Sequence, residues 1–267
     1  MAVIEQRDVR HATETGSAGL VFDSAGEGDR HMLFLHGWCG DRSFFGPQFD
    51  HFASQYRVIE VDLPGHGDSR APAVYSIDGM AADVAALGRE LGLSRCVLVG
   101  HSMGAMVALA LSRQAPELVS AVILVDPPPL SGDVWKGFAT SLLSGFEGPE
   151  PATARRNFVE QMFLPTDDGN RRAQIVATMC AAPDDVAIAT TKAMAAFDAE
   201  AILRDCKVPV VVISSAVPTN GSQYLLDVNP AITLGQTVGA GHFLQLEIPE
   251  QVNLMIERFL LVSRVAS

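Results

Sequence analysis

The chain has 267 residues, 48% of them hydrophobic, and its 19 basic and 31 acidic residues give a formal net charge of −12. This length and apolar content are enough for one large α/β domain or two small ones. The negative charge argues against nucleic acids and anionic membranes as partners, because both are themselves densely negative.

Neither the cysteines nor the first residues indicate export or metal binding. The four cysteines are far apart and form no Cys-x-x-Cys or Cys/His ligand spacing, which predicts neither a disulfide framework nor a zinc site. Charged residues interrupt the first eight positions, where a signal peptide needs an apolar core, and no apolar run reaches transmembrane length. We therefore expect a soluble cytoplasmic protein that binds no metal and does not enter a membrane.

The first 129 residues alternate short apolar runs with stretches of helical periodicity. The continuous apolar run at 32–35 is typical of a strand that is buried on both faces of a parallel sheet. Ser76 is placed to cap a helix that Gly92 ends. In chain order the expected elements are strands at 20–22, 32–35, 57–61, 96–99 and 119–125, and helices at 47–54, 77–91 and 105–114.

Residues 130–205 interrupt this alternation, since they contain helical stretches and no convincing strand. Strand–helix alternation then resumes, with strands at 208–213 and 232–238 and a last helix at 249–262. The pattern predicts an α/β core with a parallel sheet, formed by residues 1–129 and 206–267, into which a helical cap of residues 130–205 is inserted. Within the cap, proline-containing segments separate helices expected around 132–146, 152–163, 168–181 and 184–198.

Residues 97–105 read Val-Leu-Val-Gly-His-Ser-Met-Gly-Ala, which indicates a strand, an abrupt turn and a helix start, with Ser102 at the apex. Gly100 and Gly104 lie two positions to either side, where a side chain would block so sharp a turn. This arrangement lifts the serine hydroxyl above the sheet edge and directs the N-terminus of the next helix at it. The unpaired N–H groups and positive dipole end of that helix stabilise a developing negative charge. Ser102 is therefore the candidate nucleophile.

A serine hydroxyl needs a base to take its proton, and seven histidines compete for that role. Those at positions 11, 31 and 51 are expected away from the catalytic edge of the sheet. Those at positions 36 and 66 lie at that edge but close to their strands, where bonding to the backbone is expected. His101 adjoins Ser102, but adjacent residues on a tight turn point apart. His242 lies in a glycine-flanked loop after the last strand and is the candidate base.

The oxyanion hole needs two backbone N–H groups that face the carbonyl oxygen of a substrate. Met103 directly follows Ser102 at the start of the helix and is expected to supply one of them. The second is expected from the loop after the strand at 32–35, where Gly37 and Gly40 let the chain curl inward. Trp38 is the candidate in that loop.

Four motifs together resemble the α/β-hydrolase superfamily. They are His36-Gly37-Trp38, the loop from Asp62 to Ser69, the Gly-His-Ser-Met-Gly turn, and Gly241-His242-Phe243. They follow the order of that family, and the resemblance covers nearly the whole chain outside the cap. It implies an α/β fold with an eight-stranded, mostly parallel sheet flanked by helices, a helical cap over the site, and Ser–acid–His catalysis without a cofactor. Trp38 and Met103 match the oxyanion-hole positions of the family.

The acid of the triad departs from the usual pattern of the family. The family commonly places it in the loop after the seventh strand, but here that loop, residues 214–220, contains no carboxylate. Some members carry the acid after the sixth strand, and Asp126 matches that position. Asp126 also lies at the sheet edge where Ser102 and His242 emerge, and three prolines stiffen the chain after it. Asp227 is too far beyond the seventh strand and is expected on a helix, so Asp126 is the candidate acid.

The superfamily is broad, so its fold does not determine the reaction. The complete turn, base and oxyanion hole favour a carboxylic-ester hydrolase, of esterase or lactonase type, that works through an acyl-enzyme. Haloalkane dehalogenases and epoxide hydrolases need an aspartate nucleophile, and position 102 is serine. The stretch from His36 to Cys39 also resembles a loop of cofactor-independent dioxygenases. That reaction, C–C bond hydrolysis and a non-catalytic ligand receptor therefore remain alternatives.

The expected substrate is a small, largely apolar ester or lactone, because the cap is rich in aromatic and methionine side chains. Most such side chains on helices pack inside the protein. We therefore expect only two or three of the seven at positions 135, 138, 146, 158, 162, 163 and 179 to line the pocket. The acid and alcohol parts of the substrate and the oligomeric state stay open. The candidate substrate-binding residues are His36, Trp38, Phe138, Met162, Phe163 and Phe243.

Overall fold

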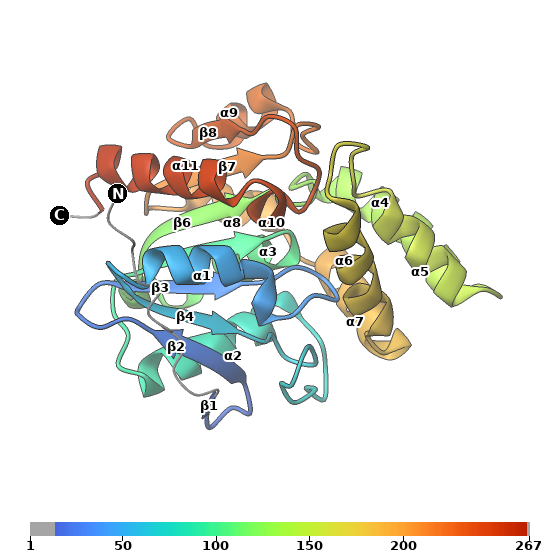
Figure 1. Cartoon of the computed structure of the whole chain (residues 1–267), viewed down its shortest axis with the longest axis horizontal. Coiled ribbons are helices and arrows are strands. Elements are labelled where there is room, and N and C mark those ends of the chain that lie inside the picture. The colour runs from blue at the N-terminus through green and yellow to red at the C-terminus, as the bar shows by residue number, and fades with distance from the viewer. Residues whose placement is uncertain (1–13, 266–267) are drawn as a thin grey trace.

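The structure, a computed structural model, describes residues 14–265 and has a central sheet with helices on both faces (Figure 1). The strands are ordered β1-β2-β4-β3-β5-β6-β7-β8, and all pairs from β4 to β8 are parallel, whereas β2 pairs antiparallel with β1 and β4. The predicted eight-stranded, mostly parallel sheet is thus confirmed. Its strands are β1 (Glu14–Thr15), β2 (Val21–Ala25), β3 (His31–Leu35), β4 (Arg57–Val61), β5 (Cys96–His101), β6 (Val119–Val125), β7 (Val210–Ser214) and β8 (Thr233–Gln236).

The central strands are buried on both faces. Successive side chains point to opposite sides of the sheet, and helices cover both sides. In β3, Leu33 and Leu35 pack into the core with α2 and α3, whereas Met32 and Phe34 pack into the core with α1 and α11. The apolar run at 32–35 is therefore explained by burial on both sides. The helices around the sheet are α1 (Gly46–Phe52), α2 (Ile77–Glu90), α3 (Met103–Gln114), α9 (Ser222–Val228), α10 (Leu244–Glu247) and α11 (Pro249–Val262), with short 3-10 helices at Arg42–Phe45 and Pro116–Leu118.

Five helices are inserted between β6 and β7, and the first four of them lie together beyond one end of the sheet (Figure 1). The first four pack on one another, α4 against α5 and α7, and α5 against α6, while α8 packs against α3 of the core. The predicted helical insertion is therefore present. The inserted helices are α4 (Gly132–Phe146), α5 (Pro151–Glu160), α6 (Gly169–Ala181), α7 (Asp184–Ala195) and α8 (Ala199–Asp205).

Helix ends that carry a capping signal agree best with the predictions. The hydroxyl of Ser76 accepts a hydrogen bond from the N–H of Gly79 at 2.9 Å and starts α2. The helix expected at 184–198 ends at Ala195 instead, and Asp198 caps a separate helix, α8, by accepting from the N–H of Ala201 at 3.0 Å. No helix within residues 14–265 is long and apolar enough to cross a membrane.

Candidate active site

Ser102 stands at the turn between β5 and α3, as its motif predicts. Its backbone angles, φ 52° and ψ −116°, lie outside the regions that residues with a side chain usually adopt. A Cβ at Gly100 would overlap the backbone of Gly104, and a Cβ at Gly104 would overlap the carbonyl oxygen of Leu35. Because only glycine fits at both positions, the chain can turn sharply here and hold the Ser102 side chain above the end of the sheet.

Asp126, the residue after β6, is joined directly to His242. It is 2% exposed, and its Oδ2 accepts a hydrogen bond from Nδ1 of His242 at 2.7 Å. Since an ionised carboxylate only accepts, the proton of the neutral imidazole is on Nδ1, and Nε2 is left as an acceptor. The pair therefore has the tautomer that a base needs in order to take a proton at Nε2.

The loop after β7 holds Asp126 in place. The other carboxylate oxygen, Oδ1, accepts from the backbone N–H of Ser215 at 2.8 Å. Farther along this loop the side-chain amide of Asn220 donates to the carbonyl oxygens of Pro127, at 3.2 Å, and Pro128, at 3.0 Å. The loop after β7, which contains no carboxylate itself, thus holds the segment that carries Asp126 in place.

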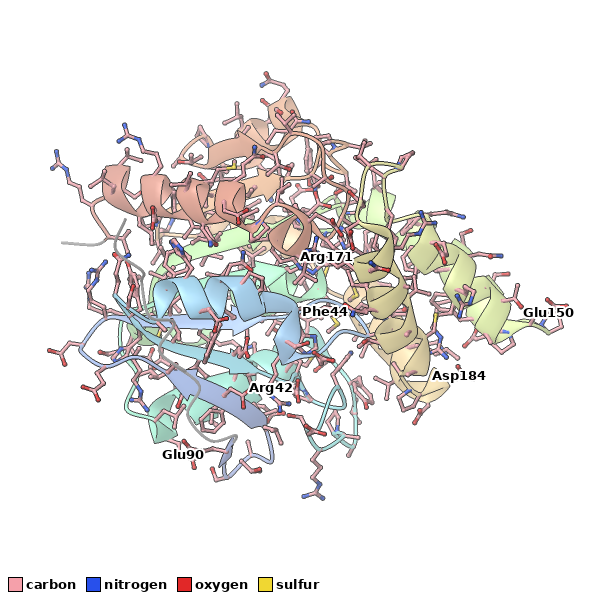
Figure 2. All side chains as sticks on the ribbon, viewed as in Figure 1. Arg42, Phe44, Glu90, Glu150, Arg171 and Asp184 are labelled. Carbon is pink, nitrogen blue, oxygen red and sulfur yellow. The ribbon has the colours of Figure 1, made fainter. Side chains whose placement is uncertain are left out.

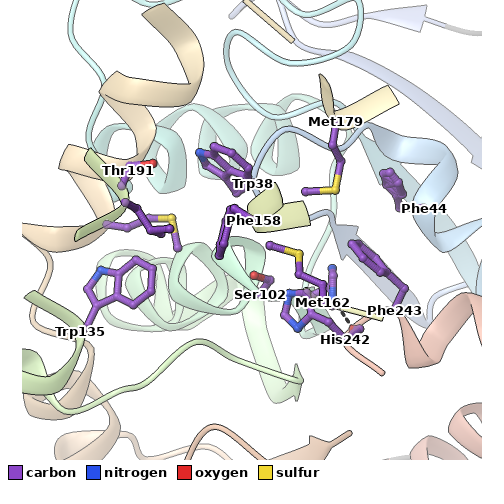
Figure 3. Close-up of a pocket in the computed structure, with 13 residues that line it drawn as sticks. Trp38, Phe44, Ser102, Trp135, Phe158, Met162, Met179, Thr191, His242 and Phe243 are labelled. Atoms are coloured by element: carbon purple, nitrogen blue, oxygen red, sulfur yellow. Dashed lines mark hydrogen bonds between the residues drawn. The ribbon is translucent and has the colours of Figure 1, made fainter. Parts of the chain in front are cut away.

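Ser102 and His242 face the same space. Both line two neighbouring cavities, and Figure 3 shows their side chains next to that of Met162. Within residues 14–265 the His242 ring is hydrogen-bonded to Asp126 and not to the Ser102 hydroxyl. Hydrogen bonds between a nucleophile and its base often tighten only when substrate binds, so this geometry is compatible with proton transfer from Ser102 to His242.

His101 links the turn at Ser102 to the loop of His242. Its Nε2–H donates to the carbonyl oxygen of His242 at 2.9 Å, and the two rings lie 4.5 Å apart. Burial lowers the pKa of His101 well below its ordinary value, and the neighbouring His242 lowers it further. His101 therefore stays neutral beside the candidate base. Sequence reasoning did not detect this contact, because nothing local to either motif indicates it.

The backbone at Trp38 passes close to the candidate nucleophile. A Cβ at Gly37 would lie 3.2 Å from Cβ of Ser102 and 2.9 Å from Nδ1 of His101, so the chain there approaches the turn closely. Met103, which follows the serine, is fully buried and is the first residue of α3. The candidate oxyanion-hole residues are thus on the two backbone segments that border Ser102.

The inner of the two cavities is small and apolar. Its volume is about 30 Å³, and it reaches from Ser102 and His242 to Trp135 and Thr191 beneath the cap (Figure 3). Three methionines border it, and their flexible side chains can move to admit a larger group. Its lining residues are Trp38, Phe44, His101, Ser102, Trp135, Leu142, Phe158, Met162, Met179, Thr191, Met194, His242 and Phe243.

The outer cavity is larger, about 380 Å³, and contains the exposed side of the Ser102–His242–Asp126 group. It lies in the size range of small-molecule sites. No lysine or arginine is among the described residues that line either cavity. Its lining residues are Ser102, Asp126, Pro128, Pro129, Phe138, Phe158, Gln161, Met162, Phe163, Leu164, Ser215, Val217, Thr219, Gly241 and His242.

Five of the six candidate substrate-binding residues line these cavities. Trp38 and Phe243 border the inner one, Phe138 and Phe163 the outer one, and Met162 both. The sixth, at position 36, does not: the expectation that this histidine contacts substrate is wrong.

His36 is fully buried, and the backbone occupies both of its ring nitrogens. Nδ1 donates to the carbonyl oxygen of Gly37 at 2.8 Å, and Nε2 accepts from the N–H of Leu63 at 3.0 Å. The estimate of two or three cap side chains at the pocket was too low, since six of the seven line one cavity or the other. The exception, Phe146, stacks on the Trp38 ring with centroids 5.5 Å apart.

The remaining histidines lie away from this site or outside the described residues. His31 contacts the backbone of Ser94, and His51 pairs with Glu257 on α11. His11 falls outside residues 14–265. In that range no group of three His, Cys, Asp or Glu side chains is placed to hold a metal ion.

Comparison with known proteins gives matches that share this fold. A family model described as alpha/beta hydrolase fold matches residues 30–159. A putative esterase/lipase of Haemophilus influenzae is 28% identical over 242 residues, which cover 86% of this chain and 82% of that protein. Other curated relatives are matched more locally: the chain spans about a third of the length of the epoxide hydrolases and about half that of two pimeloyl-[acyl-carrier protein] methyl ester esterases.

Solved structures resemble the chain over almost its whole length. A thermophilic esterase from Thermogutta terrifontis superimposes with a TM-score of 0.81 at 25% identity, covering 97% of this chain and 99% of that one. Est816, described as an N-acyl homoserine lactone degrading enzyme, superimposes with a TM-score of 0.75 at 28% identity, covering 90% of this chain and 96% of that one.

Proposed function

The chain has the α/β-hydrolase fold, and on that premise we propose that it is a serine hydrolase that cleaves an uncharged carboxylic ester or lactone through an acyl-enzyme. Ser102 is the nucleophile, His242 the base and then the acid, and Asp126 the carboxylate that orients the imidazole. The N–H groups of Met103 and Trp38 form the oxyanion hole.

In the first half of the reaction, Ser102 Oγ attacks the substrate carbonyl carbon while its proton passes to Nε2 of His242. The carbonyl oxygen becomes an oxyanion, which the two backbone N–H groups stabilise. The tetrahedral intermediate collapses when the bond to the leaving alcohol breaks and His242 gives its proton to that oxygen. Asp126 stays ionised throughout and stabilises the imidazolium.

In the second half, a water molecule takes the place of the alcohol. His242 accepts one of its protons, and the hydroxide oxygen attacks the acyl carbon. When this second tetrahedral intermediate collapses, the bond to Ser102 Oγ breaks, the proton returns to that oxygen, and the carboxylic acid leaves. A lactone follows the same steps, except that ring opening leaves the alcohol attached to the acyl part, so water releases a single product, a hydroxy acid.

The observation that carries this proposal is the 2.7 Å bond between Asp126 and His242 together with the two cavities that His242 shares with Ser102. A buried carboxylate that orients an imidazole beside a serine on a strand-to-helix turn is the arrangement that activates a hydroxyl for acyl transfer. A binding protein without activity has no need of this arrangement.

The chemistry of the cavities supports an uncharged substrate. Apolar side chains form most of both linings, and the absence of lysine and arginine from the described linings leaves no cation to pair with a substrate carboxylate or phosphate. The net charge of −12 also repels anions. The esterase and the lactone-degrading enzyme among the similar structures support esters and lactones as the classes to test.

Ser102→Ala tests the proposal against its alternatives. Wild type and variant are assayed on a panel of esters, lactones and amides, with oxygen consumption recorded on heteroaromatic substrates. We expect ester or lactone turnover to fall by roughly 10³-fold or more in the variant, because no other group replaces the nucleophile. Ester turnover within tenfold of wild type would contradict the acyl-enzyme mechanism. Oxygen consumption that survives the substitution would favour the dioxygenase reaction, and an inactive wild type that binds ligands would favour a receptor.

A further inference from the structure

The loop that carries His242 is held by the cap as well as by the core. The connection between α5 and α6, residues 161–168, lies against residues 239–242 (Figure 1). The backbone N–H of His242 donates to the carbonyl oxygen of Met162 at 2.9 Å. The N–H of the preceding Gly241 donates to Oδ1 of Asp167 at 3.2 Å. Both donors belong to the loop of the candidate base, and both acceptors belong to the cap.

Asp167 uses both of its carboxylate oxygens in this contact. While Oδ1 accepts from Gly241, Oδ2 accepts from the N–H of Leu164, in its own segment, at 2.7 Å. The two segments approach so closely that a Cβ at Gly241 would lie 2.6 Å from the carbonyl oxygen of Met162 and 2.7 Å from Oδ2 of Asp167. Hydrogen bonds to a charged acceptor are stronger than neutral ones. Asp167 therefore ties the cap segment and the His242 loop together.

A second connection lies on the other side of His242. Glu247, at the end of α10, accepts from the backbone N–H of Asp168 at 3.1 Å and pairs with Arg171 of α6 at 2.9 Å. Figure 2 shows Arg171 on the side of α6 that faces the core. The Glu247 side chain is only 5% exposed, whereas that of Arg171 is 37% exposed, so solvent screens this pair in part. The cap thus contacts the chain both before and after the candidate base.

We propose that Asp167 is a positioning residue of the active site, which fixes the backbone at Gly241 and thereby the place of the His242 ring. This inference rests on the proposed role of His242 as base. The bond to Asp126 sets the tautomer and one edge of the ring. The hydrogen bonds that the backbone of Gly241 and His242 donates to the cap set where the opposite edge of the ring, with Nε2, lies relative to Ser102. Since a misplacement of about 1 Å can cost roughly 10²-fold in rate, loss of this anchor affects chemistry more than binding.

Asp167→Ala and Asp168→Ala form a matched pair that tests the inference. Asp168 is the neighbouring carboxylate; its side chain caps α6 by accepting from the N–H of Arg171 at 2.8 Å and makes no hydrogen bond to the His242 loop among the described residues. Two quantities are measured for each variant. One is the hydrogen-exchange rate of the Gly241 and His242 amides by NMR, and the other is the pair kcat and KM for the smallest ester that the wild type cleaves.

In Asp167→Ala we expect both amides to exchange at least about tenfold faster, because Gly241 loses its acceptor and the cap segment that holds the acceptor of His242, the Met162 carbonyl, loses the bond between Asp167 and Leu164. We also expect kcat to fall by roughly 10- to 100-fold while KM changes by less than about twofold. Asp168→Ala should leave all of these near the wild-type values. Asp167→Asn retains an oxygen for one of the two N–H groups and should recover part of kcat.

The inference is wrong if Asp167→Ala leaves exchange and kcat within about twofold of wild type, or if Asp168→Ala changes them equally. Hydrogen exchange needs no turnover. If the wild type cleaves neither an ester nor a lactone, the proposed function fails, whereas faster exchange at Gly241 and His242 in Asp167→Ala alone would still show that Asp167 holds this loop.

Discussion

Asp126→Asn is expected to abolish most of the activity because it changes which ring nitrogen of His242 carries the proton. In the native site Oδ1 of Asp126 accepts from the N–H of Ser215 and Oδ2 accepts from Nδ1 of His242. An asparagine side chain has one oxygen, which accepts the hydrogen bond from the fixed N–H of Ser215. The amide NH₂ then faces His242, so Nδ1 must become the acceptor and the ring proton moves to Nε2. A histidine protonated at Nε2 cannot take the proton of Ser102.

The expected loss is roughly 10²- to 10⁴-fold in kcat, which corresponds to about 2.7 to 5.5 kcal/mol of transition-state stabilisation. The side chain keeps its shape, and its bond to Ser215 is retained, so the thermal midpoint should move by only a few degrees. The assay is kcat and KM on a chromogenic short-chain ester, with the thermal midpoint followed by circular dichroism.

Asp227→Asn is the matched control for this substitution. Asp227 is exposed on α9 and accepts a hydrogen bond from Gln223 of the same helix at 2.8 Å, so its loss should be nearly neutral. Asp126 is not the acid of the triad if Asp126→Asn keeps kcat within tenfold of wild type, or if Asp227→Asn lowers kcat more than Asp126→Asn does.

Two further predictions concern acid stability and substrate size. Burial, and to a lesser extent the neighbouring His36, lower the pKa of His66 to about 3. The unfolded chain therefore binds more protons than the folded one below about pH 6.5, and His66 alone should reduce the unfolding free energy by about 1.4 kcal/mol per pH unit as the pH falls towards 3. Urea unfolding at several pH values between 7 and 4 gives the unfolding free energy as a function of pH. In His66→Asn this free energy should fall less steeply with pH, by about that amount per unit, and an unchanged dependence on pH would contradict the prediction. Met194→Ala enlarges the inner cavity, so the kcat/KM of a butyrate ester relative to an acetate ester should rise by about tenfold. Equal ratios in variant and wild type would show that the inner cavity does not hold the acyl group.

The fold could be predicted well where the sequence carries a periodic or capping signal. The run at 32–35 alternates between two cores and is apolar throughout for that reason. Ser76 predicts the start of α2 because its hydroxyl accepts a hydrogen bond from the first turn of the helix. By contrast, the break between α7 and α8 occurs without glycine or proline, and only the hydrogen bond of Asp198 reveals it. Short elements such as β1 depend on their neighbours and have no local signal of their own.

The candidate site also has parts that the sequence predicts and parts that it does not. The places of Ser102 and Asp126 in the fold could be predicted, because a turn motif positions the first and the end of a strand positions the second. Which way a loop side chain points is decided by its partners, so His36 was expected at the substrate although it bonds to the backbone of Gly37 and Leu63. The contact of Asp167 with Gly241 joins positions far apart in the chain. No spacing rule connects such segments, because their distance is set only when the cap packs on the core.

If Ser102 is the nucleophile, it becomes acylated during turnover, and this acyl-enzyme can be trapped. The protein is mixed with an activated acetate ester, quenched with acid during turnover, digested, and its peptides are analysed by mass spectrometry. We expect one acetyl group, on Ser102, that accumulates before steady state and is absent from Ser102→Ala. Ester hydrolysis by the wild type with no acyl group on Ser102, or with the acyl group on another residue, would contradict it.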